Sequence, residues 1–147
     1  MVTVREATVS DRSRAIRTFT RAFVADPFVR WFFPDDATYE ERAAGFFGYL
    51  FDVRLDGGLV LVAEDGDGVS AWNPPGGVRH DPEDERAMWR EATERFAPDE
   101  LERIDRFDAV TGPMHPPAPH WYLGVVGVEP ERQGSGLGRA VIARGLE

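Results

Sequence analysis

The residues that this chain lacks exclude several kinds of site. None of its 147 residues is a cysteine, so disulfides, thiolate metal sites and a cysteine nucleophile are excluded. Histidine occurs only three times, at positions 80, 115 and 120, and we therefore expect no metal site. No apolar run approaches the roughly 20 residues that span a bilayer, so the sequence predicts no membrane partner.

Lysine is also absent, and the charge balance is strongly acidic. All 17 basic residues are arginines, against 26 acidic residues, which gives a net charge of −9. No basic stripe of the kind that binds nucleic acid is visible, and we expect no nucleic-acid partner. An acidic surface favours a cationic partner such as an amine, although acidic residues also simply keep a protein in solution.

Length and composition indicate one ordinary domain. Of the 147 residues, 42% are hydrophobic and 29% are charged, which excludes both a disordered chain and a membrane protein. The opening residues, MVTVREATVS, contain no basic segment followed by an apolar one. We therefore expect no signal peptide and a cytoplasmic location.

Periodicity and capping signals predict a chain that mixes strands and helices. Apolar residues alternate at 2–7, and helical spacing follows a capping box formed by Thr8 and Asp11. Two apolar segments flank a short Gly/Asp turn, which predicts a hairpin. The expected order is a strand at 2–7, helices at about 8–25 and 38–53, hairpin strands at 59–65 and 69–73, helices at 82–96 and from residue 98, a strand at 120–128 and a helix after 138.

The segment VGVEPERQGSGLG, residues 126–138, carries the chemical signal of the sequence. It joins a buried strand to a helix and contains three glycines. Glycine lets a ligand approach the main chain closely, and the first turn of a helix offers free N–H groups and the positive end of the helix dipole. These features predict a site for a phosphate or pyrophosphate. Two arginines that flank the loop, Arg132 and Arg139, could add charge-assisted contacts.

Two well-known phosphate loops do not fit this segment. The chain has no lysine for a Walker A loop, and the third glycine of a dinucleotide loop would fall at Arg139. The pattern Gln133-x-x-Gly136-x-Gly138 after a strand resembles the acyl-CoA loop of the GNAT superfamily of N-acetyltransferases. The order of elements upstream is also similar, and TVREATVSDRSRAIRTFTRAF, VLVAEDGDGVSAW and WYLGVVGVEPERQGSGLG resemble the puromycin N-acetyltransferase-like subgroup of actinobacterial enzymes.

This resemblance implies an α/β fold, with a mostly antiparallel mixed sheet flanked by helices and a two-helix insertion before the motif strand. It implies acetyl transfer from acetyl-CoA to the primary amine of a small molecule, such as an antibiotic-like one, by direct attack on the thioester. A β-branched residue at 136 or 138 should then weaken binding through its φ angle or a clash. The positions matched to cofactor binding are Val126, Val128, Gln133, Gly134, Ser135, Gly136, Leu137, Gly138 and Arg139.

The acceptor amine must lose a proton before it attacks, which requires a base or a chain of waters. The position that matches the family's base is Tyr122, and His120 lies two residues earlier on the same face of the predicted strand. The alternative is that His120 is an exposed residue at the strand end. Glu64 is another candidate base or an exposed turn residue, while we expect Glu129 on the surface.

Substrate contacts are expected in the segment 26–34, where this fold places the acceptor. Asp26 could attract an amine, and Trp31 could form an apolar wall together with Phe28 and Phe32. The alternative is that these aromatic residues belong only to the core. The same two interpretations apply to Trp72 on the hairpin.

The chain departs from the resemblance at its end. Domains of this family continue with a further strand, a helix and a closing hairpin, which carry a tyrosine that protonates the leaving thiolate, so residues 1–147 would form one domain without its C-terminal part. The motif strand would then have an apolar edge without a partner, which a second copy of the chain could cover as a homodimer. Two alternatives to a small-molecule enzyme stay open: a protein or peptide N-acetyltransferase, and an acyl-CoA-binding module without catalytic activity.

Overall fold

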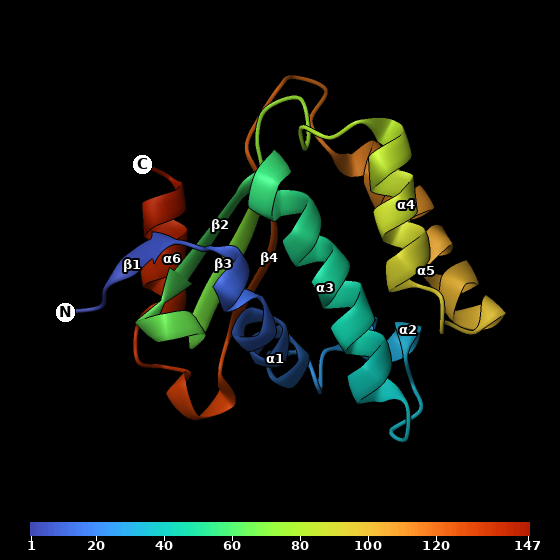
Figure 1. The fold of residues 1–147 in the computed structure, drawn as a ribbon, viewed down its shortest axis with the longest axis horizontal. Coiled ribbons are helices and arrows are strands. Elements are labelled where there is room, and N and C mark those ends of the chain that lie inside the picture. Colours follow the sequence, from blue (N-terminus) through green and yellow to red (C-terminus); the bar gives the residue numbers. More distant parts are fainter.

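An antiparallel sheet of four strands forms the centre of the molecule. The computed structural model describes residues 1–147, and its strands follow the order β1-β2-β3-β4, each antiparallel to its neighbour (Figure 1). The predicted hairpin is present, because β2 and β3 pair along their whole length. The strands span β1 Val4–Glu6, β2 Leu59–Ala63, β3 Gly68–Asn73 and β4 Tyr122–Val128.

Helices cover both faces of this sheet. Two long helices, α1 and α3, pack on one face, and α6 packs on the other (Figure 1). The predicted two-helix insertion forms α4 and α5, which lie beyond α3 and follow β3 in the chain. The helices span α1 Arg12–Ala22, α2 Pro27–Phe32, α3 Tyr39–Gly57, α4 Pro82–Ala92, α5 Pro98–Thr111 and α6 Leu137–Gly145.

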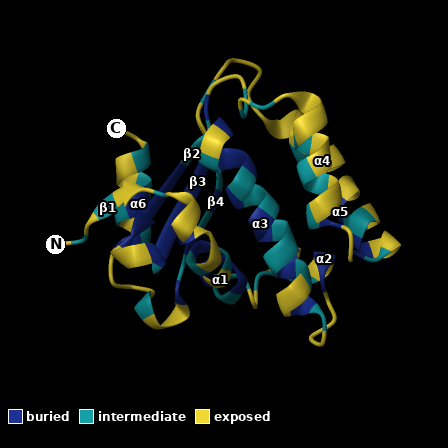
Figure 2. Ribbon diagram, viewed as in Figure 1, coloured by how far each residue is buried: buried dark blue, intermediate teal, exposed yellow.

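Aromatic side chains fill the larger part of the core, between the sheet and the helices α1 and α3. Phe19 of α1 stacks on Phe47 of α3 with 5.4 Å between ring centroids, and both rings are almost fully buried. Figure 2 shows β2 and β3 mostly in the buried colour, together with parts of α1 and α3. The buried aromatic segment Phe32–Phe33 joins this cluster, so part of the 26–34 segment belongs to the core.

Local signals account for most element boundaries. The Thr8–Asp11 capping box is present, with the Thr8 N–H donating to Asp11 Oδ2 at 2.8 Å. The Asp81 carboxylate accepts from the Glu83 N–H at the start of α4. Several expected boundaries were wrong: α3 ends at Gly57 rather than near 53, α4 ends at Ala92 rather than at 96, and β4 begins at Tyr122 rather than at 120.

β4 is an edge strand with a local irregularity. It pairs only with β3, so alternate main-chain groups along its other side have no strand partner. Ala71 lies opposite Val125 and Trp72 lies opposite Leu123, which leaves Gly124 as an extra residue in β4. This β-bulge bends the strand and increases its twist. No helix is both long and apolar enough to cross a membrane.

The open edge of β4 leads to an expectation about association. We expect the protein to self-associate, because a strand with an apolar environment on both faces and unpaired main-chain groups can pair with a second chain. Sedimentation velocity over a range of protein concentrations measures this association. A monodisperse monomer at all concentrations would contradict the expectation.

Candidate functional site

The loop between β4 and α6 has the backbone geometry of an anion site. Gly134 and Gly136 take positive φ angles of +80° and +93°, and Gly136 is the residue that caps α6. No other atom lies within 4 Å of a Cβ built on either glycine. The left-handed conformation explains why glycine stands at both positions, and the open space leaves the main chain accessible to a ligand.

Several amides of this loop have no hydrogen-bond acceptor within the protein. The first N–H groups of a helix are free unless a cap accepts from them, and no side chain caps α6. The loop and helix start also line a cavity of about 410 Å³, together with Val128. The amides without an acceptor belong to Gly134, Gly136, Leu137, Gly138 and Arg139.

Ion pairs hold the loop in place on the sheet. Arg132 Nη1 donates to Asp67 Oδ2 at 2.7 Å, and the Glu129 N–H donates to the Asp67 carbonyl at 2.8 Å. Arg21 Nε of α1 donates to Glu129 Oε2 at 2.8 Å. Glu129 is therefore a buried anchor, and the expectation that it lies on the surface was wrong. Arg139 has no ion-pair partner, so its guanidinium is available at the loop.

Gly138 differs from the other two glycines of the motif. Its φ is not positive, and a Cβ there would make only an ordinary contact with Val128 at 3.5 Å. The expectation of a clash or a φ penalty at 138 was therefore wrong for the protein by itself. At this position a side chain would compete only with a bound ligand.

A second cavity, of about 270 Å³, lies at the opposite end of β4. Tyr122 and His120 both line it, together with Asn73 of β3 and His115 of the loop before β4. The His115 ring is 4.5 Å from the Tyr122 ring and 6.2 Å from the His120 ring. The structure therefore brings both proposed catalytic residues to one cavity.

His120 reaches this cavity in a different way from the one expected. It precedes the strand, and its Nδ1 lies 2.8 Å from the carbonyl oxygen of Ala118. The alternation of side chains along a strand therefore does not explain why His120 lies beside Tyr122. The proline-rich loop before β4 places it there. Glu64 lies in the exposed hairpin turn, where its Oε1 accepts from the Thr3 N–H at 3.3 Å, so it is not near this cavity.

The residues expected to contact substrate fall into different environments. Asp26 caps α2, because its Oδ1 accepts from the N–H groups of Phe28 and Val29 at 3.0 Å. Trp31 is 41% exposed on α2. Trp72 is only 3% exposed, packs against Gly145 of α6 and donates from Nε1 to Ser70 at 3.0 Å. The expectation that Trp72 contacts substrate was therefore wrong.

Sequence reasoning missed one residue beside β4. Arg54, in the last turn of α3, is only 7% exposed and has no carboxylate partner. Burial lowers the pKa of its guanidinium, and Glu85, which forms no ion pair with it, offsets only part of this effect. A Cβ built on Gly124 would lie 2.4 Å from Arg54 Nη2, so the guanidinium lies against the β-bulge. An arginine inside an apolar helical segment is the one signal that the sequence offered.

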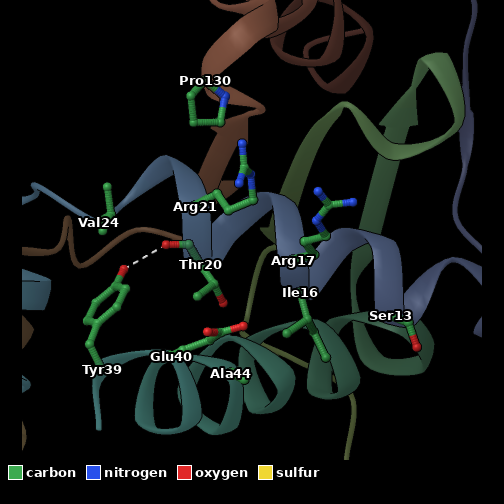
Figure 3. A pocket seen from close by; sticks show the side chains of 10 residues that line it. All are labelled: Ser13, Ile16, Arg17, Thr20, Arg21, Val24, Tyr39, Glu40, Ala44 and Pro130. Atoms are coloured by element: carbon green, nitrogen blue, oxygen red, sulfur yellow. Dashed lines mark hydrogen bonds between the residues drawn. The ribbon is translucent and has the colours of Figure 1, made fainter. Parts of the chain in front are cut away.

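The largest cavity, about 790 Å³, lies between α1 and α3 and contains none of the expected site residues (Figure 3). Ile16, Val24 and Ala44 supply apolar walls, while Arg17 and Glu40 supply charges. The Tyr39 hydroxyl donates to the Thr20 carbonyl at 2.7 Å, as Figure 3 shows. Because it offers neither a free strand edge nor free helix amides, we do not place the anion site here. No group of three or more metal-ligating side chains occurs in the structure.

Comparisons with known proteins bear on the fold. No model of a known protein family matches the chain. A solved structure described as histone acetyltransferase HPA2 and related acetyltransferase, from Corynebacterium glutamicum, is 24% identical with a TM-score of 0.65, over 99% of this chain and 70% of that one. A GNAT family acetyltransferase from Brucella melitensis, solved with acetyl-CoA, is 20% identical with a TM-score of 0.49, over 99% of this chain and 66% of that one.

The first of these likenesses extends over nearly the whole chain and concerns the arrangement of its elements. Together with the antiparallel sheet, the helices on both faces and the glycine loop between β4 and α6, it confirms the expected fold. The chain therefore has the α/β fold of the GNAT acetyltransferases.

Proposed function

We propose that this chain binds acetyl-CoA and transfers its acetyl group to a primary amine of a small molecule. The observation that carries the proposal is the row of five free amides at the start of α6, next to the open edge of β4. The likeness to solved acetyltransferases supports the fold on which this arrangement rests.

The residues of the loop fit a pyrophosphate. The free N–H groups of Gly134 and of residues 136–139, together with the positive end of the α6 dipole, favour a negatively charged group. The unpaired Arg139 guanidinium adds a charge-assisted donor. Open space around Gly134 and Gly136 lets such a group approach the main chain. When bound, the cofactor supplies the acetyl thioester that the amine attacks.

The open edge of β4 would hold the extended arm of the cofactor. We assign this role to the main chain of Val126 and Val128, whose side chains pack toward α6. A main-chain N–H near the bulge at Gly124 would stabilise the negative charge that develops on the carbonyl oxygen during attack. Fixed positions for both partners supply much of the rate enhancement of an acyl transfer.

The cavity at the other end of β4 is the proposed place of the acceptor. His120 and Tyr122 both line it, so either side chain could take the proton of the amine. An antibiotic-like acceptor remains the finer proposal, which rests on the resemblance of the sequence to the puromycin N-acetyltransferase-like subgroup.

Calorimetry and turnover test this proposal together. We expect the protein to bind acetyl-CoA in a 1:1 complex and to release the free thiol of CoA only when an amine acceptor is added. Binding without thiol release for any amine would favour an acyl-CoA-binding module, and release with peptides alone would favour a peptide N-acetyltransferase. No binding at all would overturn the proposal.

A further inference from the structure

Arg54 is a buried cation without an ion-pair partner. Its side chain is 93% removed from solvent, with 7% exposed, and no carboxylate forms an ion pair with it. Nη1 donates to the Leu50 carbonyl at 3.1 Å, while Nε has no acceptor. The C-terminal end of the α3 dipole offsets part of the cost of burying this charge. The helix end provides no acceptor for the Nε–H group. A buried donor without an acceptor lowers the stability of the folded protein.

One face of this guanidinium lies against the bulge of β4. A Cβ built on Gly124 would lie 2.4 Å from Nη2 and 2.9 Å from Nε. Only glycine therefore leaves room for Arg54 at this position. The Nε–Nη2 edge of a guanidinium is a planar fork with two parallel N–H groups, which matches the two oxygens of a carboxylate.

An unpaired acceptor lies at the same end of the sheet. Asn73 Oδ1 is buried without a donor, and Asn73 lies opposite Tyr122 in the β3–β4 register. Asn73 and Tyr122 both line the cavity at this end of β4. Two polar groups without partners thus lie near the same end of β4: Arg54 Nε, whose guanidinium lies against Gly124, and Asn73 Oδ1, opposite Tyr122.

We propose that the acceptor amine also carries a carboxylate, which Arg54 binds, while Asn73 Oδ1 accepts a hydrogen bond from the amine. This inference rests on the proposed acetyl transfer and narrows its substrate to amino carboxylates. It satisfies two of the three buried polar side-chain atoms that have no partner, the third being Thr20 Oγ1 near α3. An acceptor without a carboxylate would leave the Arg54 charge buried and unpaired.

A titration with acetate tests the anion site without acetyl-CoA. In ¹H–¹⁵N spectra of the full chain, we expect the Arg54 Nε–H signal to shift to saturation with acetate and not with acetamide, its neutral analogue, at constant ionic strength. Arg54→Met identifies the signal by removing it, and Arg54→Lys keeps the charge without the fork. As a matched control, Arg86→Met replaces an exposed arginine of α4 and should leave the response unchanged. Equal responses to acetate and acetamide, or none to either, would overturn the inference.

Turnover tests the substrate class. We compare kcat/KM for amino acids and for the matching amino-acid amides, which keep the amine but lack the carboxylate. Loss of a charge-assisted pair in Arg54→Met should lower the acid-to-amide ratio by roughly 10- to 100-fold relative to wild type. Because the acid-to-amide ratio is compared between Arg54→Met and the wild type, the difference in basicity between the two amines cancels.

The two experiments separate failure of this inference from failure of the proposed function. Equal losses for acids and amides in Arg54→Met would overturn carboxylate recognition and place Arg54 at the thioester instead. If no amine is acetylated at all, the proposed function fails, and the acetate titration still decides whether Arg54 binds a carboxylate.

Discussion

Replacing Gly136 by valine is expected to weaken acetyl-CoA binding by roughly 10- to 100-fold, which corresponds to a strain of about 1–3 kcal/mol. Gly136 is the N-cap residue of α6 and has a φ of +93°. This conformation is strongly disfavoured for a β-branched residue. The free loop would therefore leave this conformation, and binding would have to restore it. Calorimetry with acetyl-CoA measures the change in affinity.

A matched control separates the site from the strain. Gly77 has the same φ of +93° and open space around its Cβ, but it lies in the turn after β3, where it lines the proposed acceptor cavity and not the α6 loop. We expect Gly77→Val to bind acetyl-CoA with wild-type affinity. Gly138→Val adds a third comparison, because its φ is ordinary and only a bound ligand would meet its side chain. Wild-type affinity in Gly136→Val with the fold intact would reject the loop as the anion site.

Replacing His120 by alanine is expected to lower kcat/KM by roughly 10²- to 10⁴-fold, the usual contribution of a general base. His120 lines the cavity beside Tyr122, and its Nδ1 contacts the Ala118 carbonyl, which orients the ring. A histidine that accepts the proton gives the pH–rate profile a limb on which the rate falls as the ring becomes protonated. In His120→Ala this limb should disappear.

Two further variants show which residue of the cavity carries the effect. His115→Ala removes the ring that lies 4.5 Å from Tyr122 without removing His120, and it should retain most of the rate. Tyr122→Phe removes only a hydroxyl. If His120→Ala acts at nearly the wild-type rate with an unchanged pH profile, His120 is not the base, whatever the result for Tyr122→Phe.

The sequence by itself determined the order of the strands and of the longer helices, although not the short helix α2, and it determined the phosphate-like loop. These features depend on local rules. The alternation at β1, the Thr8–Asp11 box and the Asp81-Pro82 start act over a few residues, and the structure contains each of them. The positive φ angles at 134 and 136 also follow from glycine within a short strand–helix connection. A reader of the sequence could therefore locate the loop without knowing the packing.

The ends of the helices and strands were less well determined by the sequence, since the residues between two neighbouring segments can belong to either. The strand expected at 120–128 begins only at Tyr122, because Pro119 and the loop before it carry His120 away from the ladder. The helix expected to end near 53 continues to Gly57, which places Arg54 inside its last turn. The second change matters for the site, since it gives Arg54 a helical position against the sheet.

Only the tertiary structure decided which charged and aromatic side chains are buried. Glu129 is buried because Arg21, 108 residues earlier, donates to it, and Trp72 is buried because α6 covers that face of the sheet. Arg54 meets Gly124 only because α3 packs across the bulge of β4. Such contacts join residues that are far apart in the chain, and their energies depend on burial and on the partner's position. Local sequence patterns determine neither the burial of a residue nor the position of its partner. The proposed acceptor site could therefore be found only from the fold.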